Sequence, residues 1–368
     1  MHILILNWRD PKNPKSGGAE IVTLEHAKAW VKKGHNVTWF TSKFKGSKDT
    51  EKIEGINIVR RGNFLTVFLI APFFYFLSKN KFDLVIDEIH GIPFFTPLFV
   101  KKPKVAFIHE VADEIWDYMY PFPLNKIGKF LERLTFIFYK NTKFMTVSDS
   151  TRKSLVRIGI KEKNINVILN GVHIKPFTKL SDKEKIKTFI FVSRVVKMKG
   201  IEEVIKAFFH ILKEIKDGQL WIVGEGDPKY LEYLKKTMHL YTVSTKVKFF
   251  GKVSEEKKLE LMKRAHLLLH ASVKEGWGLV VIEAASLGTP SVVYNVAGLR
   301  DSVKNEKTGV VLKDNSPLEM AREVISLYKD KRRYLDFKKN SLLWAKSLTW
   351  EKATRQSQIL IEKVARVG

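Results

Sequence analysis

The sequence contains no cysteine in its 368 residues. Disulfide bonds, a thiolate nucleophile and cysteine-ligated zinc or iron–sulfur centres are therefore excluded. A chain without disulfides is suited to a reducing compartment, and we expect a cytoplasmic protein.

The sequence also has no long hydrophobic run. The longest apolar stretch covers residues 64–77 and contains Pro72, whereas a membrane-spanning helix needs about 20 apolar residues. The first residues show no basic stretch followed by an apolar segment and a cleavage site. We therefore expect neither a membrane span nor a signal peptide.

Acidic residues are few relative to basic ones. The 39 Asp and Glu residues stand against 65 Lys and Arg residues, which gives a formal net charge of +26 at pH 7. This charge indicates a polyanionic partner or surface. Nucleic acid, an anionic membrane and a diphosphate-bearing substrate all meet that requirement, and charge does not distinguish them.

Short apolar runs alternate with amphipathic helical patterns along the whole chain, which predicts an α/β fold with parallel sheets. The predicted strands form two series, the first beginning at residues 2–6 and the second at residues 188–192. The polar stretch 175–187 separates them, and we interpret it as a linker. The pattern predicts two Rossmann-like domains, residues 1–174 and 175–349.

The remaining predicted strands follow the same alternation. In the first series they are residues 37–41, 56–60, 84–86, 105–108, 144–147 and 166–169, and in the second 219–223, 246–250, 267–270 and 291–294.

Residues just after predicted strands are the candidates for ligand binding, because open α/β sheets bind ligands beyond the carboxyl ends of their strands. Gly17-Gly18-Ala19-Glu20 follows the first strand and opens a helix. Paired glycines let the backbone approach a diphosphate, and the helix N-terminus adds unpaired N–H groups. A flexible loop before a helix has the same pattern, and for this motif alone it is the better interpretation.

The second series carries a comparable loop after its first strand. Ser193-Arg194 is followed by Lys199-Gly200. Arg194 offers a bidentate fork and Lys199 a point charge for a diphosphate. Solvated surface cations are the alternative in a chain this rich in lysine, and that alternative is weakest for Arg194, which directly follows an apolar strand.

A third candidate is the segment 275–283, in which Glu275 and Glu283 flank two glycines. A carboxylate accepts paired hydrogen bonds from sugar or ribose hydroxyls, and glycines expose backbone N–H groups to phosphate. Either glutamate alone is explained equally well as a helix cap or a surface residue. The nonapeptide as a whole is not.

Taken in order, these motifs resemble those of glycosyltransferase family 4, the large retaining GT-B family. The resemblance extends from about residue 2 to about residue 355 and is specific as an ordered set. It rests on Gly-Gly-Ala-Glu at 17–20, Ser-Arg-x4-Lys-Gly at 193–200, Glu-x7-Glu at 275–283 and the segments 147–150, 170–172, 223–228 and 250–253. It implies two Rossmann-like domains facing a central cleft, with residues 350–368 crossing back as a helix onto the first domain.

The resemblance also implies roles for matching residues. Arg194 and Lys199 would hold the donor diphosphate, which Gly17 and Gly18 would meet from the first domain. His109 matches the histidine beside the transferred sugar, although a lone histidine after a strand is more often a structural hydrogen bonder. We count His109 as catalytic together with Glu275, Arg194 and Lys199.

The other donor-binding residues follow from the same resemblance. Glu275 would bind sugar hydroxyls and Glu283 the ribose. The remaining members of the set would contact a phosphate or border the base: Gly224, Val253, Gly278, Leu279 and Val280.

The sequence departs from the family pattern at two places. His173 follows Asn-Gly-Val where the family commonly has an acidic residue, and residues 87–90 match no usual motif. We assign no role to either.

The resulting hypothesis is a retaining, metal-independent hexosyltransferase that moves a sugar from a nucleotide-diphosphate sugar to an acceptor hydroxyl without a cofactor. A basic nucleic-acid-binding protein is the main alternative, but the cations are spread along the chain and no nucleic-acid module appears in it. A GT-B epimerase would lack the Glu-x7-Glu set, and a phosphorylase would need a lysine for pyridoxal phosphate. Retention of the donor-facing residues argues against an inactive homologue.

Three segments of the first domain predict an acceptor at a membrane. The apolar run 64–77 is rich in aromatics, residues 94–100 precede a lysine cluster, and residues 126–143 form a basic amphipathic pattern. We expect a lipid-linked or cell-surface glycan acceptor and peripheral contact with the inner face of an anionic cell membrane. Helices that cover the first sheet, combined with a soluble acceptor, are the alternative.

Overall fold

The computed structural model describes residues 1–78, 81–173 and 182–367. The chain divides into two compact units, one made of residues 1–171 and 350–368 and the other of residues 172–349. The predicted domain boundary at residues 174 and 175, and the first part of the predicted linker, lie outside the described residues.

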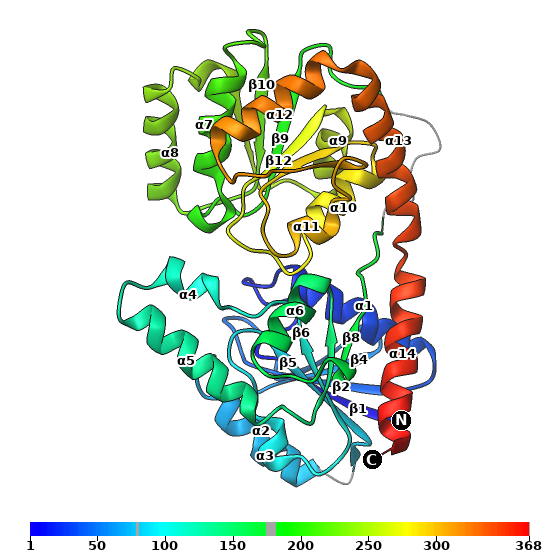
Figure 1. The fold of residues 1–368 in the computed structure, drawn as a ribbon. Coiled ribbons are helices and arrows are strands. Elements are labelled where there is room, and N and C mark those ends of the chain that lie inside the picture. Colours follow the sequence, from blue (N-terminus) through cyan, green and yellow to red (C-terminus); the bar gives the residue numbers. More distant parts are fainter. Residues whose placement is uncertain (79–80, 174–181, 368) are drawn as a thin grey trace. The chain divides into compact units, whose positions relative to one another are not determined.

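The first unit is built on an eight-stranded sheet in the order β3-β4-β2-β1-β5-β6-β7-β8 (Figure 1). All neighbouring strands are parallel except β3, which runs antiparallel to β4. The strands are β1 (His2–Leu6), β2 (Asn36–Thr41), β3 (Thr50–Ile53), β4 (Ile56–Arg60), β5 (Leu84–Ile89), β6 (Lys104–Ile108), β7 (Lys143–Thr146) and β8 (Ile165–Val167). The apolar β1, with Ile3 to Leu6 fully buried, lies in the middle, as expected for a strand covered on both faces.

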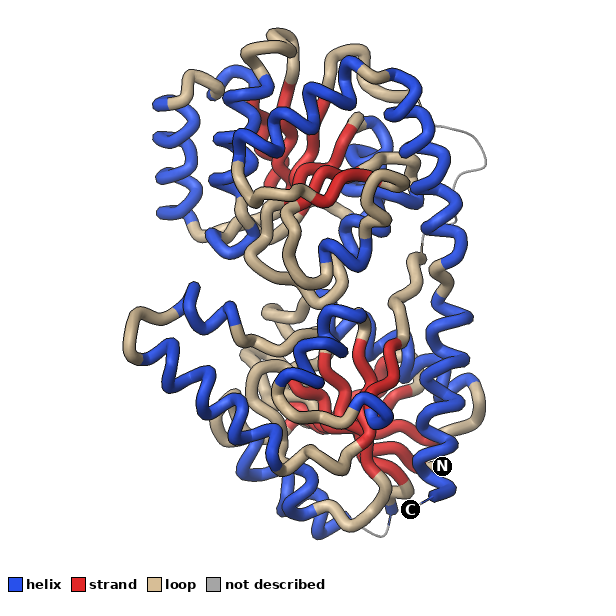
Figure 2. Tube along the Cα trace, viewed as in Figure 1, coloured by secondary structure: helices blue, strands red, loops and turns tan. Residues whose placement is uncertain are grey.

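Helices cover both faces of this sheet (Figure 2). Those of eight or more residues are α1 (Gly18–Lys32), α2 (Val67–Ser78), α5 (Leu124–Ile137), α6 (Asp149–Arg157) and α14 (Trp350–Val367), and the shorter ones are α3 (Thr96–Phe99) and α4 (Glu114–Met119). Because β1 and β5 are neighbours while the chain order reverses between them, the loops after these two strands meet at a topological switch point.

The C-terminal helix α14 packs against α1. Ser357 of α14 hydrogen-bonds to His26 Nδ1 at 2.9 Å and accepts from Trp30 Nε1 at 3.1 Å. The ring of Trp350 meets that of His26 edge-on with centroids 6.0 Å apart. The predicted return of residues 350–368 to the first unit is confirmed.

The second unit contains a six-stranded parallel sheet in the order β11-β10-β9-β12-β13-β14. Its strands are β9 (Thr188–Val192), β10 (Gln219–Val223), β11 (Val247–Gly251), β12 (Leu267–His270), β13 (Ser291–Val293) and β14 (Gly309–Val311). Its helices are α7 (Ile201–Ile211), α8 (Pro228–Leu240), α9 (Glu255–Arg264), α10 (Leu279–Ser286), α11 (Leu299–Ser302), α12 (Pro317–Lys329) and α13 (Lys331–Ser347).

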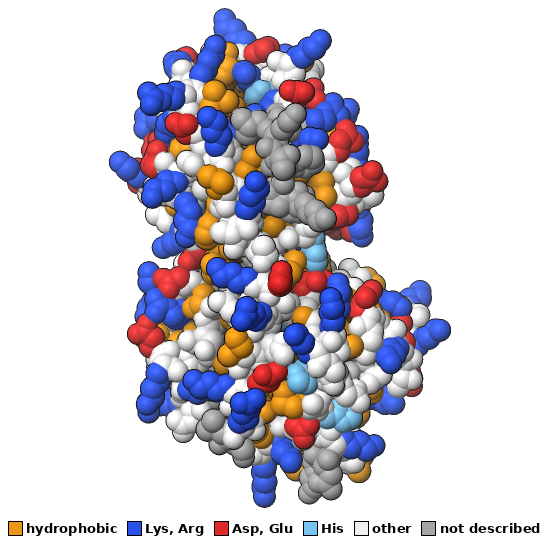
Figure 3. Space-filling view, turned by 90° about the vertical axis from the view of Figure 1, so that its right-hand side faces the viewer, with side chains coloured by type: hydrophobic (Ala, Val, Ile, Leu, Met, Phe, Trp, Pro, Cys, Tyr) orange, Lys and Arg blue, Asp and Glu red, His pale blue; other side chains and the backbone are white. Residues whose placement is uncertain are grey.

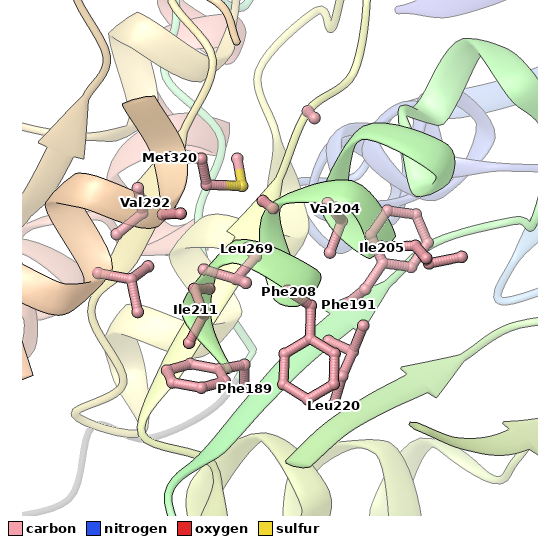
Figure 4. Close-up of a cluster of buried hydrophobic side chains, with 14 of the residues drawn as sticks. Phe189, Phe191, Val204, Ile205, Phe208, Ile211, Leu220, Leu269, Val292 and Met320 are labelled. Carbon is pink, nitrogen blue, oxygen red and sulfur yellow. The ribbon is translucent and has the colours of Figure 1, made fainter. Parts of the chain in front are cut away.

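Alternate residues of β9 belong to two different hydrophobic cores. Phe189 and Phe191 pack with Phe208 of α7 and with α12 on one face of the sheet (Figure 4). Ile190 and Val192 face α9 and α10 on the other. A shift of β9 by one residue would move each side chain to the wrong core, so the register of the strand is fixed. The end of the strand in turn determines where the following loop begins.

Candidate functional site

The loops after β9 and β12 meet at the carboxyl edge of the second sheet. The two strands are neighbours at the switch point of that sheet. The Val273 N–H donates to the carbonyl of Met198 at 3.0 Å, and Ser272 Oγ donates to the same carbonyl at 3.2 Å. The loop carrying Lys199 is therefore bound to the loop carrying Glu275.

Glycine is required where these loops touch. A Cβ on Gly200, whose φ is +72°, would lie 1.9 Å from the carbonyl oxygen of Ala271. A Cβ on Gly224 would lie 1.8 Å from that of Ser193. Both distances are far below van der Waals contact, so any other residue would force the loops apart.

Lys199 and Glu275 form an ion pair at this edge. Lys199 Nζ lies 2.6 Å from Glu275 Oε1, and His270 Nε2 lies 3.6 Å from the same oxygen. Burial alone would raise the pKa of Glu275, but Lys199 and His270 outweigh it and hold that pKa below 4.5. Burial lowers the pKa of His270 to about 4, so this histidine is neutral at pH 7.

Helix α10 begins beside this pair. Gly278 is its N-cap with φ +80°, and Leu279 and Val280 are its first residues, whose N–H groups have no acceptor within the helix. Glu283, one turn in, lies 2.8 Å from Lys258 Nζ of α9. Burial raises the pKa of Glu283 despite this lysine. Unpaired N–H groups at a helix start suit an anion.

Arg194 lies two residues after the end of β9, and it is exposed. Among the described residues its side chain has no ion-pair or hydrogen-bond partner. The turn after β10 and the end of β11 border the same edge, because the Val195 N–H donates to the Glu225 carbonyl and the Gly224 N–H donates to the Gly251 carbonyl. Val253 follows β11 two residues later.

The glycine pair of the first unit lies at the start of α1. Gly17 is the N-cap of α1, and its N–H donates to Glu20 Oε2 at 2.6 Å. Arg9 Nε binds the other Glu20 oxygen at 2.9 Å. Burial opposes ionisation of Glu20, but His90, Arg9 and the Gly17 N–H lower its pKa to about 2. The Gly17 N–H is therefore already occupied, although both glycines are exposed.

His109 follows β6 and hydrogen-bonds through Nε2 to Glu88 Oε1 at 2.8 Å. Three of the residues 87–90, to which the sequence assigned no role, have polar contacts at the end of β5: Asp87, Glu88 and His90. Asp87 accepts from Tyr139, Thr96 and the Phe94 N–H, Glu88 holds His109, and His90 contacts Arg9.

The structure brings most predicted donor residues to one edge of one sheet: Arg194, Lys199, Gly224, Val253, Glu275, Gly278, Leu279, Val280 and Glu283. Gly17, Gly18 and His109 belong to the first unit. The sequence did not identify three partners of the predicted site residues: His270, Lys258 and Glu88. A histidine that ends a buried apolar strand is a usable signal for His270, whereas one lysine among so many gave none for Lys258.

The residues described contain no cluster of three or more His, Asp or Glu side chains that would hold a metal ion. In the same part of the chain, no helix combines the length and the apolar character required to cross a bilayer. Lys and Arg side chains are scattered and interspersed with acidic ones on the face drawn in Figure 3, rather than gathered in one tract.

Fold and site together define a GT-B glycosyltransferase. The model of the family "Glycosyltransferase Family 4" matches residues 16–175, and that of "Glycosyl transferases group 1" matches residues 174–344. The chain belongs to glycosyltransferase family 4, and it is a retaining enzyme that uses a nucleotide-sugar donor.

Known proteins are similar to this chain in sequence or in fold. An uncharacterised glycosyltransferase of Methanocaldococcus jannaschii is 27% identical over 311 residues, which cover 79% of this chain and 78% of that protein. The structure of HepE from Anabaena with UDP-glucose matches with a TM-score of 0.77, 17% identity and coverage of 99% and 100%. That of WaaG, a glycosyltransferase involved in lipopolysaccharide biosynthesis, matches with a TM-score of 0.77, 17% identity and coverage of 98% and 99%.

Proposed function

We propose that the second unit binds the nucleotide-diphosphate sugar at the carboxyl edge of its sheet. Lys199 and Arg194 bind the diphosphate, Glu275 binds sugar hydroxyls and Glu283 binds the ribose. The observation that carries this assignment is the Lys199–Glu275 ion pair of 2.6 Å beside the first N–H groups of α10. A cation, a carboxylate and the N-terminus of a helix, which suits an anion, thus lie on two loops that are hydrogen-bonded to each other.

Transfer breaks the bond between the anomeric carbon and the diphosphate oxygen and forms a bond from that carbon to the acceptor oxygen on the same face. The departing phosphate takes the proton of the acceptor hydroxyl. Negative charge grows on the leaving oxygens, and Arg194, Lys199 and the N–H groups of α10 stabilise it most in the transition state. We assign His109 of the first unit to the transferred sugar on the family resemblance alone.

A panel of nucleotide sugars tests the donor assignment by thermal stabilisation, because a ligand that binds the folded protein raises its melting temperature by mass action. The true donor should raise the Tm of the wild type in proportion to the logarithm of its concentration. The shift should shrink in Lys199→Ala and in Glu283→Ala. Equal shifts in the wild type and both variants would refute the assignment.

For the acceptor, we infer a lipid-linked glycan at an anionic membrane. Helix α2 fills the core with Val67, Ala71 and Tyr75 and still presents apolar side chains on its other face. Phe73 is 70% exposed and Leu77 is 88% exposed. Covering the sheet therefore explains only half of this helix, and exposed aromatic and aliphatic residues of this kind mark an interaction surface.

Helix α5 extends the same apolar surface. Only Gly128 and Phe136 of this helix are buried, whereas Phe130 is 60% exposed. The ring of Phe138, at the end of α5, meets that of Phe95, which precedes α3, with centroids 6.2 Å apart. We call this set the apolar surface: Leu69, Phe73, Phe76, Leu77, Leu98, Phe122, Ile127, Phe130, Leu131, Leu134, Ile137 and Phe138, all exposed.

The charges around the apolar surface favour an anionic leaflet. Glu132, the acid of α5, accepts from the backbone of Ala112 and Asp113 and from Trp116 Nε1, so its charge is engaged with α4. Lys126 and Arg133 remain exposed on α5. Each cation near an anionic surface contributes about 1 kcal/mol. WaaG, whose structure is similar, is involved in lipopolysaccharide biosynthesis, which agrees with a lipid-linked acceptor.

Vesicle co-sedimentation tests the membrane contact. Binding should require anionic lipid and weaken steeply with salt. Phe73→Ser with Leu77→Ser, and Phe130→Ser with Leu131→Ser, should each lower the bound fraction at least about tenfold, since burying one large apolar side chain contributes about 1.5–3 kcal/mol. The control is Leu240→Ser with Leu343→Ser, which removes two exposed leucines of the second unit. Equal binding to neutral and anionic vesicles, or equal loss in the control, would contradict the assignment.

A further inference from the structure

Two adjacent carboxylates at the end of β5 are completely buried. Asp87 and Glu88 both have no exposed surface. A buried carboxylate is costly unless it is hydrogen-bonded, so the partners of each one reveal what it does. Asp87 accepts from the Phe94 N–H at 3.1 Å and from Thr96 Oγ1 at 2.7 Å, and thus holds the loop that follows its own strand.

Glu88 is directed to other elements. Its Oε1 lies 2.8 Å from His109 Nε2, and its Oε2 accepts from Thr23 Oγ1 of α1 at 2.8 Å. In the sheet register Glu88 lies opposite Phe107, two residues before His109. One carboxylate therefore links the middle of α1 to the residue that follows β6.

Both the backbone and the imidazole of His109 have partners in the first unit. The carbonyl of His109 accepts from Thr151 Oγ1 at 2.9 Å, and its ring lies 4.5 Å from that of Phe107. Its side chain is only 13% exposed. A carboxylate accepts hydrogen bonds, so the contact with Glu88 places the proton of His109 on Nε2. In the neutral ring Nδ1 is then the acceptor nitrogen.

We propose that Glu88 is a positioning residue that fixes the orientation and the Nε2–H tautomer of His109, so that Nδ1 accepts a hydrogen bond from a hydroxyl of the transferred sugar. The contact with sugar rests on the function proposed above. The tautomer of His109 and its dependence on Glu88 do not rest on that function. Thr23 fixes Glu88 in turn, as outer partners of functional histidines commonly do.

The neighbouring histidine does not compete for this role. His26 of α1 packs edge-on against Phe107 with centroids 5.9 Å apart. Burial lowers the pKa of His26 to about 3, so it is uncharged at neutral pH. A neutral imidazole places no charge beside His109, whereas the Glu88 carboxylate is in direct contact with it.

The tautomer is measured by long-range proton–nitrogen NMR of protein labelled with 15N-histidine, with the His109 signals assigned from their loss in His109→Gln. The wild type should show the Nε2–H form. Glu88→Leu should lose it or show exchange between both tautomers. Glu88→Gln, whose amide oxygen can still accept from Nε2, should restore the tautomer. Asp87→Asn removes a buried charge from the same strand and should leave the His109 spectrum unchanged.

Kinetics with the true donor form the second arm. Glu88→Leu should lower kcat about 10–100-fold, the usual effect of an outer partner, with the donor KM changed less than threefold. In the His109→Gln background the same substitution should cost nothing further, because Glu88 acts through His109.

An unchanged tautomer in Glu88→Leu overturns the inference, as does a full additional loss of kcat in the double variant. Absence of transfer with every nucleotide sugar, together with the expected change of tautomer, refutes the proposed function while the role of Glu88 stands.

Discussion

Arg194 and Lys199 occupy neighbouring positions in one loop but differ in their contacts. Lys199 is held by Glu275 at 2.6 Å, whereas the Arg194 guanidinium is exposed and has no partner among the described residues. A diphosphate would therefore meet one cation that is already fixed and one that is still mobile about its side-chain bonds. Substitution of Arg194 breaks no side-chain contact with another described residue of the unliganded protein. Arg194 is therefore the clearer position for a test of diphosphate binding.

Arg194→Ala should lower kcat/KM about 10²–10³-fold, comparable to the loss of one preorganised donor at a developing charge. The melting temperature should stay unchanged, because the side chain supports no other described residue. Steady-state kinetics and thermal unfolding check both parts. Lys235→Ala removes an exposed cation from α8 and should have no effect on turnover. Normal turnover of a folded Arg194→Ala variant would show that the diphosphate lies elsewhere.

Glu275 and Glu283 should respond differently to substitution. Glu275→Gln should slow transfer but spare binding of the free nucleoside diphosphate, since this side chain is assigned to the sugar. Glu283→Ala should weaken nucleotide binding itself, since Glu283 is assigned to the ribose. Calorimetric titration with the nucleoside diphosphate, together with transfer rates, separates the two effects. The reverse pattern would exchange the two roles.

The sequence predicted which residues form the candidate site better than it predicted what they touch. Strand ends and glycines are local signals, so Lys199 and Glu275 could be selected from the chain alone. Their mutual contact depends on two loops from neighbouring strands, 76 residues apart. The contact of Glu88 with His109 also joins neighbouring strands, so packing between elements brings these residues together, whereas His270 lies only five residues before Glu275.

Helices α1 and α14 meet at His26, which makes the stability of their contact dependent on pH. Burial lowers the pKa of His26 from 6.5 to about 3, and its Nδ1 is bonded to Ser357. The unfolded chain gains a proton here below pH 6.5 while the folded unit does not. The stability contributed by neutral His26 is therefore fully present above pH 6.5 and is lost as the pH falls towards 3.

Helix α14 should consequently open more readily at pH 5 than at pH 7. Hydrogen exchange of its amides, corrected for intrinsic rates, measures this opening. His26→Gln, which stays neutral at both values, should reduce the difference. An identical pH dependence in His26→Gln would show that another group controls the helix.

Most elements were predictable because their patterns are strong. Apolar runs gave β9, β10 and β12 with the bounds observed, and periodicity gave α1. The strand β3 was missed, since Thr-Glu-Lys-Ile is polar and forms an antiparallel edge. The three-residue β14 was also missed.

For the whole molecule, transfer should not depend on a divalent metal. Arg194, Lys199 and the start of α10 already supply positive charge to a leaving diphosphate. A metal ion would otherwise stabilise that negative charge. Activity should be the same in EDTA and in added magnesium or manganese. Loss of activity in EDTA with recovery in manganese would contradict this prediction.

The division of the chain also sets the order in which its parts are completed during synthesis. Residues 172–349 are contiguous and leave the ribosome before the last 19 residues, 350–368, which the first unit needs. A chain truncated after residue 349 contains the whole second unit, whereas its first unit lacks α14 and exposes the side of α1 that carries His26 and Trp30. Limited proteolysis of the truncated chain should leave the second unit intact and cleave α1, whereas the full chain should resist cleavage at both places.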